Sequence, residues 1–478
     1  MLTADVERWL SLHRDEMAKD IAELVKIPSV SADGDGNDPG GNGGEQKGQP
    51  FGEACARVLL QAERMAARWG FECRNEDGYY TSFLWQGEME EEIGIFAHLD
   101  VVPEGEGWSF PPFSGSIREG CVYGRGAGDN KGPGTAAFYA LCCLKELGWK
   151  PKHSIRMFWG VNEETGMADI EYYLAKHQAP AFSLVPDSVF PVCVGEKGKV
   201  EVEAVYDLGD SGILEYEAGI SVNSVPAVAS VVLAGDRGSL CCGLQGVCDR
   251  YGLNLENEEK GLRVTAYGTA SHAAMPERAD NAQVKLARAL LESGVLDEGA
   301  AVYVQTVVDL FGDCFGKGLE IEAEDEIFGR LTHVGGRAYM RDGEVVQTVD
   351  IRYGMGIEFS RISDCVVQVM DSRGYRILRI SDDPPHYYDR GAPVIQAVRQ
   401  ISSQVLGRSM EPAVIGGGTY ARRLKQAAGC GPGIPWIKSA YGPGKGRGHQ
   451  PDEYVELDRM EKCFRIYVEA VVAVDEMV

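Results

Sequence analysis

The stretch Ile93-Gly-Ile-Phe-Ala-His-Leu-Asp100 joins a short hydrophobic run to two polar residues that can take part in chemistry. The run at 93–97 predicts a buried strand, because four to eight consecutive apolar residues are typical of one. His98 and Asp100 stand two positions apart, so an extended chain directs both to the same side. A metal-bound imidazole commonly donates its second N–H to a carboxylate, and the pair offers that arrangement or a plain ion pair.

Helices and strands alternate around this first strand. Residues 1–24, 53–69 and 135–147 predict helices, and residues 154–161 predict a second strand. This order is typical of an α/β sheet with helices on both faces. Ligands of such sheets gather outside the carboxyl ends of the strands. The polar residues that directly follow the strands are therefore the first candidates for a site.

The pattern changes near residue 198 and changes back near residue 386. The elements predicted in between are strands at 200–206 and 345–353 and helices at 282–291 and 360–370. A helix at 392–406 and new polar clusters follow. We predict one domain built from 1–197 and 386–478, interrupted by an inserted α/β domain at 198–385.

The composition excludes several classes of protein. The 72 acidic and 47 basic residues give a net charge of −25, which argues against nucleic-acid binding. No window reaches the roughly 18 apolar residues of a membrane span, and the charged first helix does not resemble a signal peptide. The 13 cysteines form no C-x-x-C pair, as in a protein with reduced thiols. We therefore expect a cytoplasmic protein without a membrane or nucleic-acid partner.

Two glycine-rich stretches are candidate ligand-binding loops. The segment 33–48 predicts a mobile surface loop, and Asp33, Asp35 and Asp38 make a calcium loop the alternative, although the EF-hand spacing is missing. The loop Gly124-Arg-Gly-Ala-Gly-Asp-Asn-Lys-Gly-Pro-Gly134 lacks the spacing of a phosphate loop. Asp129 would repel a phosphate, so a carboxylate held by these glycines suits a cation better.

Further acidic and imidazole groups follow predicted strands or lie in irregular loops. Glu163 and Glu164 follow the second strand, Asp187 follows a short apolar run, and His449 lies in a Gly/Pro-rich loop. Taken alone, Glu163 and Glu164 read more simply as a solvated pair at a strand end, whereas packing does not explain a histidine in so irregular a loop. Together with His98 and Asp129 they suit two divalent ions that share a carboxylate, while a remaining carboxylate acts as general base.

Taken in order, these motifs resemble the co-catalytic zinc exopeptidases of peptidase family M20, relatives of aminoacylase and glutamate carboxypeptidase. The resemblance is strongest to the PepV-like (Sapep-type) dipeptidases. It implies a zinc-exopeptidase-like catalytic domain with a mixed sheet flanked by helices and an inserted α/β lid domain. The runs that carry it are His98-Leu-Asp-Val-Val-Pro-Glu-Gly, Gly124 to Pro133, Asn162-Glu-Glu-Thr-Gly, Val185-Pro-Asp-Ser-Val-Phe-Pro, Gly195-Glu-Lys-Gly and Gly448-His-Gln-Pro-Asp-Glu.

The resemblance also implies a role for each residue. Asp129 would bridge two ions, with His98 and Asp187 at one of them and Glu164 and His449 at the other. Glu163 would be the general base that activates the attacking water, and Asp100 would orient His98. In the inserted domain, His272 would donate to the developing oxyanion; a Ser271–His272 nucleophile pair is the alternative. The substrate contacts would be Asn223, Arg352, Gly417, Gly418, Thr419 and Arg422.

The function implied is that of a metal-dependent dipeptidase acting on dipeptides or short peptides, with two ions of zinc, or else manganese or cobalt. An N-acyl- or succinyl-amino-acid amidohydrolase with the same centre is the nearest alternative, and a non-catalytic metal- or peptide-binding protein is the other. Arg352 has its own alternative, an ion pair with Asp350. Asn130, where aspartate is commoner, and Arg447-Gly448 depart from the pattern, which leaves the substrate preference open. The oligomeric state, monomer or homo-oligomer, stays undecided.

Overall fold

Two units share the polypeptide, each with a hydrophobic core of its own. The structure is a computed structural model that describes residues 2–32, 48–442 and 444–478. Unit 1 comprises Met1–Gly195 and His386–Val478, and unit 2 comprises Glu196–Pro385. Apart from Gly48, the glycine-rich loop predicted at 33–48, with its calcium alternative on Asp33, Asp35 and Asp38, lies outside the described residues.

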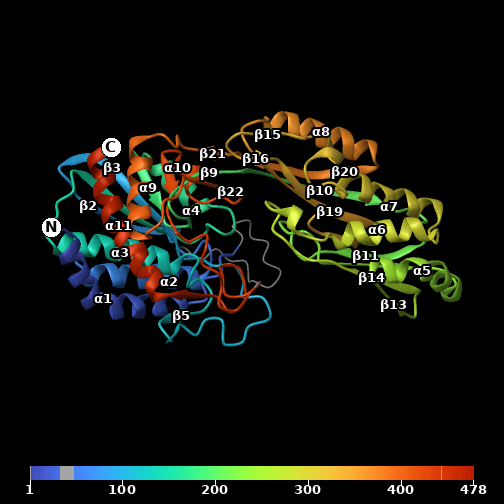
Figure 1. Ribbon diagram of the computed structural model, residues 1–478, viewed down its shortest axis with the longest axis horizontal. Helices are drawn as coiled ribbons and strands as arrows, with labels where there is room; N and C mark the ends of the chain where they lie inside the picture. Colours follow the sequence, from blue (N-terminus) through green and yellow to red (C-terminus); the bar gives the residue numbers. More distant parts are fainter. Residues whose placement is uncertain (1, 33–47, 443) are drawn as a thin grey trace. The chain divides into compact units, whose positions relative to one another are not determined.

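The main sheet of unit 1 is mixed, and its strand order is β1-β2-β6-β3-β7-β23-β9-β21 with β22 beside β9. Figure 1 labels β2, β3, β9, β21 and β22 of this sheet. Its centre is parallel and consists of β6 (His153–Gly160), β3 (Met89–His98), β7 (Phe182–Val185) and β23 (Ala427–Gly429). The other strands are β1 (Arg74–Glu76), β2 (Tyr80–Trp85), β9 (Cys193–Glu196), β21 (His386–Tyr387) and β22 (Ala413–Ile415). The expected mixed sheet is thereby confirmed.

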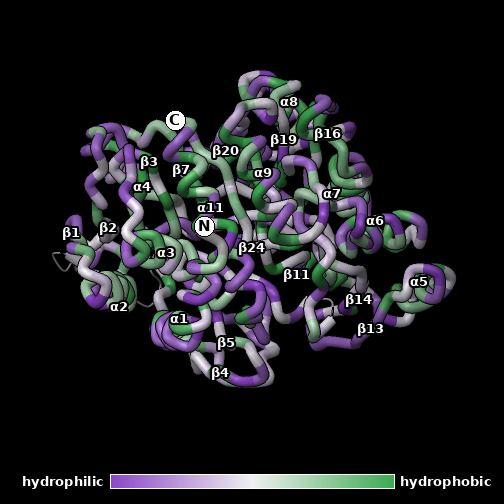
Figure 2. The backbone as a smooth tube through the Cα atoms, turned by 60° about the vertical axis from the view of Figure 1, so that its left-hand side comes forward, coloured by the Kyte–Doolittle hydropathy of each residue, from purple (hydrophilic) through white to green (hydrophobic). Residues whose placement is uncertain are grey.

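Helices cover both faces of this sheet because side chains alternate along its buried strands. Ile95 and Met157 join the larger core, whereas Phe96 and Phe158 join a smaller core. The larger core includes residues of α1 (Leu2–Val25), α2 (Glu53–Arg68), α3 (Lys131–Glu146), α9 (Pro393–Val405) and α11 (Leu457–Met477). The smaller core includes residues of α4 (Ala168–Lys176) and α10 (Ala421–Leu424). Hydrophobic and hydrophilic residues alternate along α1, as expected of a helix with one buried side (Figure 2).

Local pairings in unit 1 bring two glycine-rich loops together. β25 (Tyr454–Glu456) pairs with β5 (Cys121–Tyr123), which pairs with β4 (Ser116–Arg118). The Gly124 N–H continues this contact by donating to the Glu453 carbonyl over 2.9 Å. A second small sheet joins β8 (Ser188–Val189) to β24 (Pro432–Gly433). The loop after β5 therefore lies beside the loop that precedes β25.

Unit 2 is built on an antiparallel sheet of order β13-β14-β12-β11-β18-β19-β10-β20, with β17 beside β19. Its strands are β10 (Gly198–Asp207), β11 (Ile213–Ala218), β12 (Val228–Leu233), β13 (Leu253–Asn257), β14 (Leu262–Tyr267), β17 (Thr332–Val334), β18 (Ala338–Arg341), β19 (Glu344–Tyr353) and β20 (Tyr375–Asp383). A separate hairpin joins β15 (Glu324–Asp325) to β16 (Gly329–Arg330). The helices are α5 (Arg237–Tyr251), α6 (Ala282–Ser293), α7 (Glu298–Phe311) and α8 (Phe359–Ser372), with short 3₁₀ turns at Pro276–Arg278 and Lys317–Leu319.

Each element named in the sequence analysis is found close to its predicted place. The predicted helices correspond to α1, α2, α3, α6, α8 and α9, and the predicted strands to β3, β6, β10 and β19. Helices α5 and α7 of unit 2 were not predicted. None of the described helices has the length and apolar content that crossing a bilayer requires.

Candidate metal centre

Three acidic or imidazole segments meet at the carboxyl ends of neighbouring parallel strands. His98 is the last residue of β3, Glu163 and Glu164 lie in the turn after β6, and Asp187 follows β7. β3 pairs with both β6 and β7, so their ends lie side by side. This is the edge where α/β sheets bind ligands.

Asp129 lies between two histidines. Its Oδ1 is 3.2 Å from Nε2 of His98, and its Oδ2 is 3.3 Å from Nε2 of His449. A Cβ atom at Gly448 would lie only 2.7 Å from Oδ2 of Asp129, so the loop needs glycine there to approach this closely. One carboxylate therefore presents an oxygen to each imidazole, which is the arrangement that a shared ligand requires.

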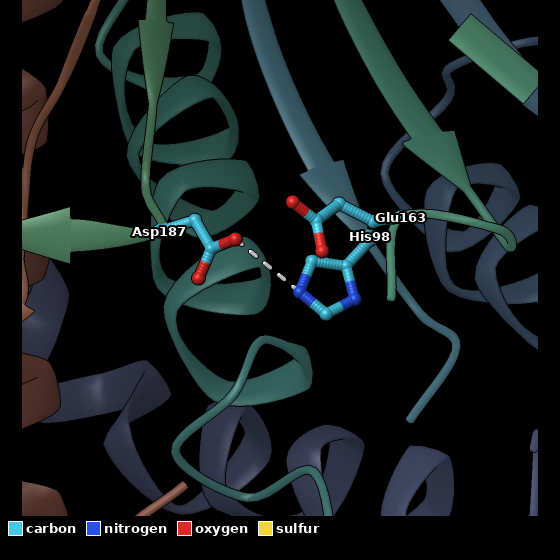
Figure 3. A group of neighbouring side chains, drawn as sticks. All are labelled: His98, Glu163 and Asp187. Atoms are coloured by element: carbon cyan, nitrogen blue, oxygen red, sulfur yellow. Dashed lines mark ion pairs between the residues drawn. The ribbon is translucent and has the colours of Figure 1, made fainter. Parts of the chain in front are cut away.

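Further carboxylates complete the cluster on each side. Oδ2 of Asp187 is 3.4 Å from Nε2 of His98, and Oε1 of Glu164 is 3.0 Å from Nε2 of His449. Figure 3 shows His98, Glu163 and Asp187 directed toward one another, with the Glu163 carboxylate beside the imidazole ring. Two groups of three residues could each hold a metal ion, because the possible ligand atoms within each group lie within 4.8 Å of one another. The first group is His98, Glu163 and Asp187, and the second is His98, Asp129 and Glu164.

Asp100 has a second task that the sequence pattern did not reveal. Nδ1 of His98 faces the backbone carbonyl of Asp100 at 3.0 Å and its Oδ1 at 3.4 Å. Donation from Nδ1 leaves Nε2 without a proton and able to bind a cation. The Asp100 carboxylate also accepts the backbone N–H groups of Glu163 and Glu164, at 3.2 and 3.0 Å. The fully buried Asp100 therefore ties the end of β3 to the turn after β6.

The electrostatics of the cluster suit cations. Burial raises the pKa of Glu163 well above its ordinary value, and the neighbouring carboxylates of Asp187 and Glu164 add to this effect. Burial likewise raises the pKa of Glu164, to about 7. Oε1 of Glu163 is buried and has no hydrogen-bond partner among the described residues. Imidazole and carboxylate donors without a thiolate fit zinc, manganese or cobalt.

Asn130 supports two of these side chains. Its Oδ1 accepts the backbone N–H of His98 at 3.4 Å, and its Nδ2 donates to the Pro186 carbonyl and to Oδ1 of Asp187, the latter at 3.2 Å. An aspartate at this position would replace the Nδ2 donor by an oxygen, which would face the Pro186 carbonyl and the Asp187 carboxylate without a proton to share. The amide therefore suits its surroundings, although it departs from the commoner residue.

Residues 94–473 match the sequence model described as peptidase family M20/M25/M40. The chain belongs to this family. It is 31% identical over 96% of its length to YtjP of Bacillus subtilis (strain 168), covering 97% of that protein. It is 28% identical to the Beta-Ala-Xaa dipeptidase of Lactobacillus delbrueckii subsp. lactis, with 96% of each chain covered. The structure of human carnosine dipeptidase 1 has the same fold, with a TM-score of 0.57 at 15% identity over 99% of this chain and 100% of that one.

Family membership and fold class are thus confirmed, and they place the cluster in the chain of an M20 peptidase. Peptidases of this family depend on metal ions, and the described residues supply a group that can hold them. The roles of the particular ligands, of the general base and of the substrate contacts are predictions.

The segment 417–422 of this M20 peptidase, which contains four of the predicted substrate contacts, is linked to the turn that carries Glu163. Arg422 is buried, and its Nη2 donates to the Gly417 carbonyl at 3.2 Å. Gly418 packs so closely on the Arg422 guanidinium that a Cβ atom would overlap it. The neighbouring Tyr420 donates its hydroxyl to Asp169, which also accepts the backbone N–H of Asn162 at 2.8 Å.

Asp169 predicts a measurable pH dependence of stability. Burial, assisted by the charge of Asp100, raises its pKa from 3.8 to about 7. A carboxyl group with a raised pKa stabilises the fold fully below about pH 4 and loses that contribution as the pH rises to about 7. For Asp169→Asn, which cannot titrate, we expect the stability relative to the wild type to rise by about 2–3 kcal/mol between pH 5 and pH 7.5. Urea unfolding of both proteins at the two pH values measures this difference, and parallel pH profiles would refute it.

Two residues predicted to contact substrate lie beside each other in unit 2. The Asn223 carbonyl accepts the backbone N–H of Ala273 at 2.9 Å, next to His272. Nδ1 of His272 accepts the Ala274 N–H at 3.1 Å, so the neutral ring carries its proton on Nε2, as a donor to an oxyanion requires. Ser271 donates its hydroxyl to the Met275 carbonyl, which gives no support to a Ser271–His272 nucleophile pair.

Arg352, the third predicted contact in unit 2, forms the ion pair that was its alternative. Nε and Nη2 of Arg352 donate to the two oxygens of Asp350 at 2.6 and 2.8 Å, and both side chains are buried. This two-point geometry fixes the guanidinium plane. The substrate-binding role of Arg352 stays a prediction beside the ion pair.

Proposed function

We propose that this M20 chain is a metal-dependent dipeptidase that hydrolyses the peptide bond of dipeptides or short peptides. The observation that carries the proposal is Asp129, whose two oxygens face two different imidazoles while Glu163 lies in the same cluster. The family match and the Lactobacillus relative named as a Beta-Ala-Xaa dipeptidase support it.

The proposed centre holds two divalent ions, zinc before manganese or cobalt. The chemistry that such a pair supplies is polarisation of the scissile carbonyl and activation of water near neutral pH. His98 and Asp187 would hold one ion, Glu164 and His449 the other, and Asp129 both. The number and identity of the ions are part of the proposal.

Glu163 is the proposed general base. It would take a proton from the attacking water and deliver it to the amine that leaves, so one carboxylate serves both halves of the reaction. Asp100 accepts the Glu163 N–H and faces Nδ1 of His98, so it would orient base and ligand together. Because Asp100 contacts both residues, it would fix the distance between the proposed base, Glu163, and the proposed metal ligand, His98.

The chain termini of a short peptide are the proposed recognition elements. The substrate carboxylate would be bound by Gly417, Gly418, Thr419 and Arg422, since backbone N–H groups and guanidinium groups are good carboxylate donors. Arg352 is proposed separately as a further substrate contact. Asn223 would contact the substrate backbone, and His272 would donate to the oxyanion, a contact worth several kcal/mol in acyl transfer. A cytoplasmic location also belongs to the proposal, on the pattern of the cysteines.

A substrate panel tests the proposed function. Metal-free protein, reconstituted separately with Zn²⁺, Mn²⁺ and Co²⁺, is assayed on an α-dipeptide, a β-alanyl dipeptide, a pentapeptide and an N-acetyl-amino acid. For at least one of the two dipeptides we expect a kcat/KM about tenfold higher than for the pentapeptide and the N-acetyl-amino acid. A tenfold difference corresponds to about 1.4 kcal/mol of discrimination. Preference for the N-acetyl-amino acid would favour the amidohydrolase, and lack of any hydrolysis with every ion would favour a non-catalytic binding protein.

A further inference from the structure

A buried ion pair joins the two glycine-rich loops that carry Asp129 and His449. Nη1 of Arg125 donates to Oε2 of Glu453 at 2.7 Å. The side chains are 2% and 0% exposed, so water does not screen the pair. Arg125 precedes Asp129 by four positions, and Glu453 follows His449 by four, although the two partners are 328 residues apart.

Glu453 holds the backbone of Asp129. Its second oxygen, Oε1, accepts the N–H of Gly128 at 2.9 Å and the N–H of Asp129 itself at 3.2 Å. One carboxylate oxygen thus faces the arginine and the other faces the segment that presents Asp129. Moving the Glu453 carboxylate would move the peptide from which the Asp129 side chain projects.

Arg125 reaches the other loop. Nη1 also donates to the carbonyl of Gln450, the residue after His449, at 3.2 Å. Nη2 donates to the carbonyls of Pro103 and Glu104 at 3.4 and 3.1 Å. The Trp108 ring lies 5.2 Å from the guanidinium carbon. The guanidinium therefore connects the segment after β3 with the loops of Asp129 and His449.

A buried ion pair is a poor device for stability alone, because removing two charges from water costs about as much as their attraction returns. Its value lies in fixed geometry, since a guanidinium and a carboxylate meet at defined angles. We propose that Arg125 and Glu453 are positioning residues that set the spacing of Asp129 and His449 for metal binding. This inference rests on the metal centre of the proposed function.

The test measures Zn²⁺ affinity of metal-free protein by competition with a chromophoric chelator, without any assay of activity. Glu453→Gln keeps the size of the side chain but turns an amide toward Arg125 or toward the Asp129 N–H. We expect its Zn²⁺ affinity to fall roughly 10- to 100-fold, as for other groups that orient metal ligands. Arg125→Lys, which keeps a cation beside Glu453, should lose less affinity than Arg125→Met.

Asp20→Asn is the matched control, because the buried Asp20 pairs with Arg68 and accepts the Tyr139 hydroxyl between helices α1, α2 and α3. It should lower the unfolding temperature but leave Zn²⁺ affinity within twofold. A folded Glu453→Gln protein with wild-type affinity would overturn the positioning role. If that variant does not fold, equal affinities of Arg125→Lys and Arg125→Met would overturn it. A wild-type protein that binds no Zn²⁺, Mn²⁺ or Co²⁺ would instead remove the proposed metal centre, and this inference with it.

Discussion

Asp129→Asn is expected to abolish binding of both metal ions and to lower kcat/KM by roughly 10³-fold or more. The wild-type carboxylate turns one oxygen to the His98 side and the other to the His449 side, at 3.2 and 3.3 Å from the imidazoles. An amide keeps only one of these oxygens, and its NH₂ group cannot bind a cation. Because metal ions supply several kcal/mol of charge stabilisation in such reactions, their loss removes most of the rate.

Elemental analysis after gel filtration and the dipeptide assay measure the two effects together. Asp15→Asn, which removes the same charge from an exposed position of helix α1, is the control and should retain both metal and activity. If Asp129→Asn retained two ions per chain with wild-type affinity, Asp129 would not be the shared ligand. Retention of a single ion would show that one of the two sites holds its ion without the bridge.

Part of this site could be predicted from the sequence, because a polar residue directly after an apolar run marks the end of a buried strand. His98, Glu163 and Asp187 follow buried apolar runs, and parallel strands bring such ends to one edge of a sheet. Asp129 and His449 lie in glycine-rich loops with no periodicity, so only their chemistry grouped them with the rest and only the resemblance gave them their roles. Their proximity depends on the pairing of β5 with β25, two strands of three residues whose partners no local pattern reveals.

The hydrogen bonds by which Asp100, Arg125 and Glu453 hold neighbouring turns and loops could not be predicted, although the contact between Asp100 and His98 was. The alternation rule placed Asp100 on the side of His98, but β3 ends at His98, and beyond that residue the rule no longer applies. The Asp100 carboxylate turns toward the N–H groups of Glu163 and Glu164, a contact set by the turn after β6. Arg125 and Glu453 stood inside the motifs, yet a motif does not say which acceptor a guanidinium will find.

The two missed helices of unit 2 had signals of different strength. Helix α5 contains glycines and buries only Leu240, Leu244 and Val247, but Asp236 caps its start by accepting the Ser239 N–H. Gly252, in the left-handed conformation, ends it. These end signals could have revealed it. Helix α7 is rich in valine, which favours strands, so burial of its apolar side had to override local preference.

Glu163→Gln is expected to lower kcat by roughly 10²- to 10⁴-fold while both metal ions stay bound, because an amide cannot take the proton that a general base removes. Oε1 of Glu163 is buried without a hydrogen-bond partner among the described residues, as suits a group that meets its partner only when water and substrate arrive. Turnover of a dipeptide under saturation and the metal content of the same sample are the two measurements.

The adjacent Glu164→Gln is the matched contrast. Oε1 of Glu164 lies 3.0 Å from Nε2 of His449, as suits a metal ligand. We therefore expect Glu164→Gln to lower the metal content of the protein, whereas Glu163→Gln should lower only the turnover. Glu163 itself belongs to a group that can hold an ion with His98 and Asp187, which makes a ligand role its direct competitor. If Glu163→Gln loses metal as readily as Glu164→Gln, Glu163 is a ligand and another group must be the base. If it keeps its metal and its turnover is wild-type, Glu163 is neither.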